Sequence, residues 1–333
     1  MNENGDSMND YYQSYSELYM KESEEKKSIK YIGKIAGRCI IGYVLIQNIA
    51  SLLLFSSPLG AIYDADPDFQ SVVSIFFSLS GILIPFGIGG YFIGKRTKTD
   101  VFNLNKPVST KLMLAAVPFG FFVCLAGNYI TSVFVNFMDG AGVHLTSPEY
   151  VVPSGIAGRL IYIVSIAVVP PLVEEFAIRG VIMQPLRKYG DVFAIIASAL
   201  VFAVLHGNLI QAPFALIAGI GIGYAVCITN SVWTGVLIHA VNNLYSVITE
   251  FMVEDITDEA KLNQVYLITT IALYAVSILG SVLFIVLKKR RRLMPSFTSL
   301  SESRKMFSFV WSISMIIALF MMFCITKTFV EIS

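Results

Sequence analysis

Two adjacent glutamates, Glu174 and Glu175, lie inside an apolar stretch long enough to cross a membrane, and Arg179 follows them by one helical turn. An ionisable side chain at the centre of a bilayer costs about 2.5–3.5 kcal/mol on insertion scales, so such residues usually face a partner, a cavity or a reaction. Two histidines, His206 and His239, lie in separate apolar segments further along the chain. Because carboxylates and imidazoles on converging helices are typical of hydrolytic and metal-binding sites, we expect these residues to perform chemistry.

Helical spacing separates the roles of the two glutamates. Glu175 and Arg179 are four residues apart and share one helix face, so we expect an ion pair that neutralises both charges inside the bilayer. Glu174 is rotated from Glu175 by about 100°, which keeps it from sharing the same arginine. Glu174 is therefore predicted to be free for catalysis; the alternative is a neutral carboxylic acid that is hydrogen-bonded to a neighbouring helix.

Each of the two histidines has a helical neighbour one turn away. His206 follows Phe202 by four residues, so the phenyl ring and the imidazole share a helix face. His239 and Asn243 are also four residues apart and present an imidazole and a carboxamide side by side. Each of these residues alone could form an ordinary interhelical hydrogen bond. Together with Glu174 they make four polar positions on three spans, which predicts one functional site.

The composition shows what kind of protein must position these residues. Of the 333 residues, 55% are hydrophobic and 14% are charged, and the mean hydropathy is +0.69. A soluble core cannot bury that much apolar surface, so the chain is predicted to be an integral membrane protein with the lipid bilayer as its partner. The net charge is +1, and the basic residues gather at helix ends instead of lining one patch, which argues against nucleic-acid binding.

Apolar runs of about 20 residues, the length of a membrane-crossing helix, recur along the chain. They predict an all-α, polytopic transmembrane helix bundle with about nine spans (eight or nine). Residues 1–30 are expected to form a polar cytoplasmic tail and 31–333 a transmembrane domain, with a catalytic core at about 155–250. We place the spans near residues 38–60, 71–94, 112–136, 156–180, 191–208, 209–229, 232–252, 264–287 and 307–325.

The charged loops predict how the spans are oriented. Cytoplasmic loops of membrane proteins carry an excess of Lys and Arg. With the basic loops in the cytoplasm, nine spans alternate without a conflict, which places the N-terminus in the cytoplasm and the C-terminus outside. The basic clusters are at 26–38, 95–98, 187–188 and 288–292, and the alternate, acidic loops are at 64–68, 139–149 and 254–259.

Three short motifs follow one another on the spans that carry the polar residues. EExxxR is matched at 174–179, FxxxH at 202–206 and HxxxN at 239–243. In this set of motifs the chain resembles the CPBP intramembrane proteases. That family includes the eukaryotic CAAX prenyl proteases and the bacterial Abi proteins, which are linked to bacteriocin processing and self-immunity. The resemblance covers about 155–250.

The resemblance implies an endopeptidase with a site inside the membrane, and a bacterial cell membrane as its location. By that likeness Glu174 would be the general base that activates water together with His206, while His239 and Asn243 would stabilise the oxyanion of the tetrahedral intermediate. Its substrate would be a membrane-associated peptide or a lipidated protein, such as a prenylated protein, a bacteriocin leader or a pheromone precursor. The oligomeric state is left open.

The residues leave the use of a metal open. Glu174, His206 and His239 could complete a three-ligand zinc site with an open position for water, as in an intramembrane metalloprotease. A glutamate–histidine pair could also act without a metal. Helix geometry adds a difficulty, because His239 lies about 10 Å from the cytoplasmic start of its span and His206 about 22 Å from the start of its own.

Two other classes of function fit the same polar residues. A proton-coupled transporter also uses carboxylates and histidines inside the membrane, but many transporters are built from internal repeats, and the EExxxR segment has no second copy. A non-catalytic scaffold could confer immunity by binding a partner without cleavage. The complete set of motifs favours the protease over both.

Overall fold

The computed structural model describes residues 3–101, 106–148 and 151–332, with side chains from Glu17 onward. Glu149, one of the acidic residues of the predicted topology, lies outside the described residues. Within these residues, seven helices are long and apolar enough to cross a membrane, or eight if a bent pair is counted as one span. The predicted all-α, polytopic bundle is confirmed, and the number of spans is close to the predicted eight or nine.

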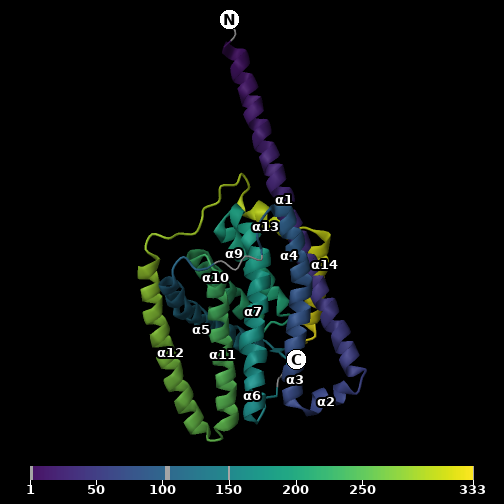
Figure 1. Cartoon of the computed structure of the whole chain (residues 1–333), viewed down its shortest axis with the longest axis vertical. Helices are drawn as coiled ribbons and strands as arrows, with labels where there is room; N and C mark the ends of the chain where they lie inside the picture. The colour runs from purple at the N-terminus through teal and green to yellow at the C-terminus, as the bar shows by residue number, and fades with distance from the viewer. Residues whose placement is uncertain (1–2, 102–105, 149–150, 333) are drawn as a thin grey trace.

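Most of the long helices stand side by side with their axes roughly parallel (Figure 1). The helices before the motif-bearing segment are α1 (Glu3–Phe55), α2 (Leu59–Ala65), α3 (Pro67–Ser78), the π-helical turn η1 (Leu79–Leu83), α4 (Ile84–Thr97) and α5 (Thr110–Gly140). The helices of the motif-bearing segment are α6 (Ile156–Ile163), the π-helical turn η2 (Val164–Val168), α7 (Val169–Glu175), the π-helical η3 (Phe176–Met183), α8 (Gln184–Leu186), the 3-10 turn η4 (Arg187–Tyr189), α9 (Asp191–Leu205), α10 (Ala212–Thr229) and α11 (Val232–Asp255).

The C-terminal part of the chain returns to the elements near its start. Its helices are α12 (Glu259–Lys288), α13 (Glu302–Val310) and α14 (Ile313–Lys327). Helix α12 packs against α5, whereas α13 and α14 pack against α1. Strand β1 (Val143–Leu145) pairs antiparallel with β2 (Val330–Ile332), so the end of the described chain is fixed beside the end of α5.

Two predicted spans differ from the structure. The span predicted at 191–208 is α9, whose 15 residues extend about 22 Å, less than the thickness of the hydrocarbon core of about 30 Å. The span predicted at 307–325 is the pair α13 and α14, which are bent by 76°. Hydropathy cannot separate these cases, because a helix buried inside protein, as most of α9 is, has the same apolar sequence as one that faces lipid.

The predicted polar tail at 1–30 is continuous with the first span. Helix α1 begins at Glu3 and runs for 53 residues, and its first part extends beyond the bundle (Figure 1). Among its described side chains, the first that is fully buried is Ile29, close to the predicted start of the transmembrane domain. At Gly33 the backbone of α1 approaches α13 so closely that a Cβ atom would overlap the carbonyl oxygen of Phe309.

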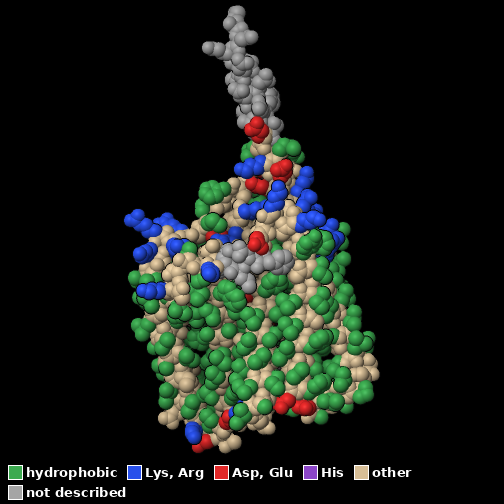
Figure 2. Space-filling model, viewed as in Figure 1, with side chains coloured by type: hydrophobic (Ala, Val, Ile, Leu, Met, Phe, Trp, Pro, Cys, Tyr) green, Lys and Arg blue, Asp and Glu red, His purple; other side chains and the backbone are tan. Residues whose placement is uncertain are grey.

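Charges gather at the two ends of the bundle, and the surface between them is apolar (Figure 2). On the face shown, Lys and Arg side chains surround the end where α1 projects, and acidic side chains lie at the opposite end. This distribution is typical of a helix bundle that spans a bilayer.

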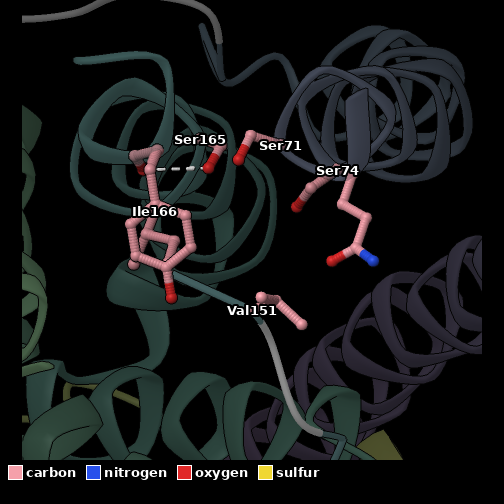
Figure 3. Close-up of a pocket in the computed structure, with 7 residues that line it drawn as sticks. Ser71, Ser74, Val151, Ser165 and Ile166 are labelled. Atoms are coloured by element: carbon pink, nitrogen blue, oxygen red, sulfur yellow. Dashed lines mark hydrogen bonds between the residues drawn. The ribbon is translucent and has the colours of Figure 1, made fainter. Parts of the chain in front are cut away.

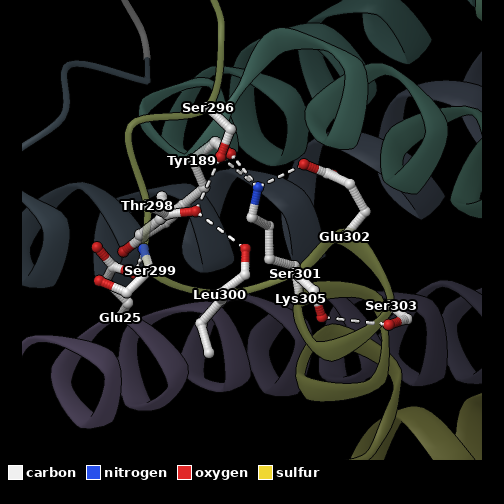
Figure 4. A network of polar contacts seen from close by, with 10 residues as sticks. All are labelled: Glu25, Tyr189, Ser296, Thr298, Ser299, Leu300, Ser301, Glu302, Ser303 and Lys305. Carbon is white, nitrogen blue, oxygen red and sulfur yellow. Dashed lines mark hydrogen bonds and ion pairs between the residues drawn. The ribbon is translucent and has the colours of Figure 1, made fainter. Parts of the chain in front are cut away.

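The turn from η4 into α9 is held by the C-terminal segment. The carboxylate of Asp191 accepts a hydrogen bond from the backbone of Met294 at 2.8 Å. The ammonium of Lys305, fully buried on α13, donates to the carbonyl of Tyr189 at 2.8 Å and to Ser296 Oγ at 2.6 Å, and it pairs with Glu302 at 2.7 Å (Figure 4). Three acceptors therefore satisfy the ammonium away from water.

Candidate active site

The backbone around the two glutamates is not a regular α-helix. Pro170 and Pro171 lie in the first turn of α7, where the hydrogen-bond donors that they lack are not needed. The turns on both sides, η2 and η3, are π-helical and wider than an α-helix, a feature that is frequent at functional sites. Glu174 and Glu175 are the last two residues of this seven-residue helix.

Glu175 and Arg179 are fully buried and lie against each other. Arg179 Nε is 3.0 Å from Glu175 Oε2, and neither side chain has any exposed surface. The angles do not make this contact a hydrogen bond, and within the described residues the guanidinium has no hydrogen-bond acceptor. Its central carbon instead lies 5.3 Å from the centroid of the Phe202 ring, a cation–π contact. Charge attraction and the aromatic face hold the arginine in place.

His239 lies between the two glutamates. Its Nδ1 is 3.2 Å from Glu175 Oε1, and its Nε2 is 3.9 Å from Glu174 Oε2. Because an ionised carboxylate can only accept, Nδ1 carries a proton and Nε2 is directed at Glu174. The side chain of Glu174 is 23% exposed, whereas that of Glu175 is 0% exposed. The four side chains thus form a row from the interior to the accessible carboxylate, in the order Arg179, Glu175, His239 and Glu174.

His206 follows the last residue of α9 and is fixed by its own helix. Its Nδ1 donates to the carbonyl of Phe202 at 2.8 Å, which leaves Nε2 of the neutral imidazole as an acceptor. The Phe202 ring lies edge-on to both imidazoles, with ring centroids 4.8 Å from His206 and 5.7 Å from His239. Both imidazoles therefore contact one aromatic ring, although helix geometry places the two histidines at different distances from the starts of their spans.

Asn243 connects α11 to the widened turn η2. Its Nδ2 donates to the carbonyl of Ile166 at 2.9 Å, and its Oδ1 accepts from Asn242 Nδ2 at 3.2 Å. One amide hydrogen of Asn243 remains for another partner. Asn242 is itself buried, and sequence reasoning did not select it; its position next to the motif asparagine was the available signal.

A glycine that sequence reasoning missed lies against the buried carboxylate. A Cβ atom at Gly235 would stand 2.5 Å from Glu175 Oε2, so the absent side chain makes room for this oxygen. Gly235 precedes His239 by one helical turn, and that spacing on a polar helix face was the signal that could have identified it.

A small pocket lies beside η2 and is lined in part by Ser165 and Ile166 of this turn (Figure 3). Its volume is about 10 Å³, enough for about one water molecule, so it is too small for a peptide substrate. Ser71 and Ser165, both buried, are among the residues that line it.

The structure brings some predicted site residues together and leaves one apart. Glu174 and His239 are adjacent, but within the described residues no hydrogen bond or ion pair joins Glu174 to His206. The described part of the chain also contains no group of three His, Cys, Asp or Glu side chains that could hold a metal ion. Glu174, His206 and His239 in this arrangement therefore do not fit the three-ligand zinc site that the sequence left open.

Residues 156–245 match the model of a protein family described as Rce1-like, type II CAAX prenyl endopeptidase Rce1-like. This segment contains all three motifs, and the match is consistent with the CPBP family that the motifs indicate. No curated protein and no solved structure matches the chain. The helices on either side of the segment lie outside the match.

Proposed function

We propose that the chain is an intramembrane endopeptidase that hydrolyses membrane-associated or lipophilic peptide and protein substrates. The observation that carries this proposal is the accessible carboxylate of Glu174, which lies 3.9 Å from an imidazole nitrogen of His239 within the Rce1-like segment. Such a pair is suited to moving a proton between water and a leaving group.

In this mechanism Glu174 takes a proton from a water molecule, and the water oxygen attacks the carbonyl carbon of the scissile peptide bond. The proton then passes to the amide nitrogen, the carbon–nitrogen bond breaks, and a carboxylic acid and an amine leave. The distance of 3.9 Å exceeds a hydrogen bond, but catalytic contacts often tighten when substrate binds.

Glu175 positions His239, the second group in this mechanism. Glu175 accepts the Nδ1 proton of His239 and so holds the ring with Nε2 directed at Glu174, from where Nε2, when it carries a proton, donates a hydrogen bond to the oxyanion of the tetrahedral intermediate. The remaining amide hydrogen of Asn243 is the second donor. Nε2 of His206, which the bond from Nδ1 to Phe202 leaves as an acceptor, accepts a hydrogen bond from the attacking water.

Zinc has no step in this mechanism, because the described side chains do not form a three-ligand set. We also propose that the N-terminus and the basic end of the bundle face the cytoplasm of a bacterial cell and that the C-terminus is external. The basic segment after α12, at 288–292, supports this orientation.

The test is the detection of a product. Purified protein in lipid vesicles is incubated with lipidated and unlipidated peptides, and new peptide termini are measured by mass spectrometry. We expect cleavage by the wild type and none by Glu174→Gln. The matched control is Glu250→Gln, which also removes one carboxylate, at a site on α11 where Tyr162 donates to it at 2.7 Å.

The alternative functions give different results in the same vesicles. Equal cleavage by the wild type and Glu174→Gln would refute the assignment of the base. Proton flux without any product would identify a transporter, and the absence of both would favour a scaffold.

A further inference from the structure

A groove of about 360 Å³ lies between α1 and α13, remote from the candidate active site. We call it the α1–α13 groove, and the residues that line it are Lys26, Ser303, Arg304, Phe307 and Ser308. The two helices touch at Gly33 and separate toward Lys26, two turns earlier on α1, where the groove opens.

The groove is placed at the membrane surface by the bend between α13 and α14. This bend of 76° means that when α14 crosses the bilayer, α13 runs along its surface. Phe307 and Trp311 stack on each other with ring centroids 5.2 Å apart, and both are more than half exposed. Tryptophan and tyrosine are enriched at the level of lipid headgroups, so the exposed Trp311 places the opening of the groove where headgroups lie.

The charges that line the groove favour an anion. Arg304 pairs with Glu22 through one nitrogen at 3.0 Å, and its side chain remains 55% exposed, so the other guanidinium donors are accessible. Lys26 is exposed and adds a second cation. Glu302, the acidic residue next to Ser303, is directed at Lys305 and neutralised by it (Figure 4). Glu25, which precedes Lys26, accepts a hydrogen bond from the backbone of Ser299 at 3.3 Å. Lys26 and Arg304 are therefore the charged residues that line the groove itself.

The hydroxyl groups add fewer free donors than their number suggests. Ser308 Oγ donates to the backbone carbonyl of Arg304 at 2.7 Å, and Ser303 Oγ lies 3.3 Å from Ser301 Oγ. Charge from Lys26 and Arg304 is therefore the main attraction for a ligand, and the guanidinium supplies the geometry that suits phosphate oxygens.

We propose that the α1–α13 groove binds the headgroup of an anionic phospholipid. The phosphate lies between Lys26 and Arg304, and the acyl chains extend along the exposed rings of Phe307 and Trp311 toward α14. A free phosphate has the same charge chemistry but makes no use of this aromatic surface, which favours the lipid.

The position of Trp311 allows a direct test. Trp233 and Trp311 are the two tryptophans of the chain, so Trp233→Phe leaves a single tryptophan, beside the groove, whose fluorescence can be excited selectively over that of tyrosine. This protein is reconstituted into two sets of phosphatidylcholine vesicles. One set contains chain-brominated phosphatidylcholine and the other contains the same fraction of chain-brominated phosphatidylglycerol. We expect quenching to show a preference of about five- to thirtyfold for the anionic lipid, since each basic residue near the surface contributes roughly a factor of five.

Matched variants locate the preference. Lys26→Gln with Arg304→Gln should reduce it to near one, whereas Arg290→Gln with Arg291→Gln removes the same charge from the same end of the bundle and should preserve it. Arg304→Lys keeps the charge and should retain most of the preference, which controls for folding.

Three results would overturn the proposal. Equal quenching by the two brominated lipids in the Trp233→Phe protein without further substitutions would show that the groove does not select anionic lipid. An equal loss in both double variants would assign the effect to general surface charge. Loss of the preference on adding inorganic phosphate, but not chloride of equal ionic strength, would assign the groove to free phosphate.

Discussion

Gly235→Ala is expected to disturb the candidate active site by displacing the buried carboxylate of Glu175. The added Cβ atom would lie 2.5 Å from Glu175 Oε2, whereas ordinary van der Waals contacts begin at 3.4 Å. The carboxylate must therefore move by about 0.9 Å, the difference between these two distances. The new methyl group would also press on Val226 Cγ2 at 3.0 Å, so α11 cannot simply shift toward α10.

The carboxylate has little freedom to make that move. It lies 3.0 Å from Arg179 Nε and 3.2 Å from His239 Nδ1, and it can yield only by lengthening one of these contacts. Overpacking costs about 1–3 kcal/mol, and the better helix propensity of Ala offsets about 1 kcal/mol of that. Catalysis should suffer more, because a displacement of about 1 Å at a catalytic group can lower the rate about 10²-fold.

The assay compares kcat/KM for peptide cleavage in vesicles with the thermal unfolding of the same protein in detergent. We expect Gly235→Ala to lose about 10²-fold in kcat/KM while its unfolding free energy falls by no more than about 2 kcal/mol. Gly87→Ala is the control, because no atom lies within 4 Å of its Cβ position; it should keep full activity. Wild-type activity of Gly235→Ala would refute the idea that Glu175 is fixed and that its position matters.

Four further outcomes are expected. Glu174→Ala and His206→Ala should each reduce cleavage by about 10²–10⁴-fold at unchanged thermal stability, and the double variant should be little worse; more than about a tenth of wild-type activity in either would contradict its role. Arg179→Ala should strand Glu175 and lower the unfolding free energy by roughly 3–5 kcal/mol, whereas a stable but inactive variant would place the arginine in contact with substrate. Asn243→Ala should lose about 10²–10³-fold in rate if its amide stabilises the oxyanion. Metal analysis should find little zinc and chelators should leave activity intact; one bound equivalent, lost and restored together with activity, would contradict the metal-free mechanism.

Local features of the site could be predicted from the sequence. The contact between Glu175 and Arg179 depends on helical spacing, which places residues four apart on one face. The shared face of Phe202 and His206 has the same origin. Composition likewise determines the membrane bundle, because so much apolar surface excludes a soluble fold.

Features that depend on packing between helices could not be predicted. His239 lies beside Glu174 because α11 packs against α7, and no sequence pattern orders the three motif helices in space. The widened turns around Pro170 and Pro171 change which way the glutamates face, and the regular helix used for prediction does not contain them. Helix α9 also ends at Leu205, before the predicted limit of the span, with Gly207 at a positive φ of 66°.

The hydrogen bond from Lys305 to Tyr189 joins residues 116 positions apart, and it has a consequence for biosynthesis. A ribosome adds about 5–20 residues per second, so Tyr189 is made roughly 6–23 s before Lys305. During that interval the turn before α9 has neither its ammonium nor the backbone of Met294, its partner from the segment before α13. In a nascent chain the turn that leads into α9 would therefore gain its final contacts only after α13 has been made.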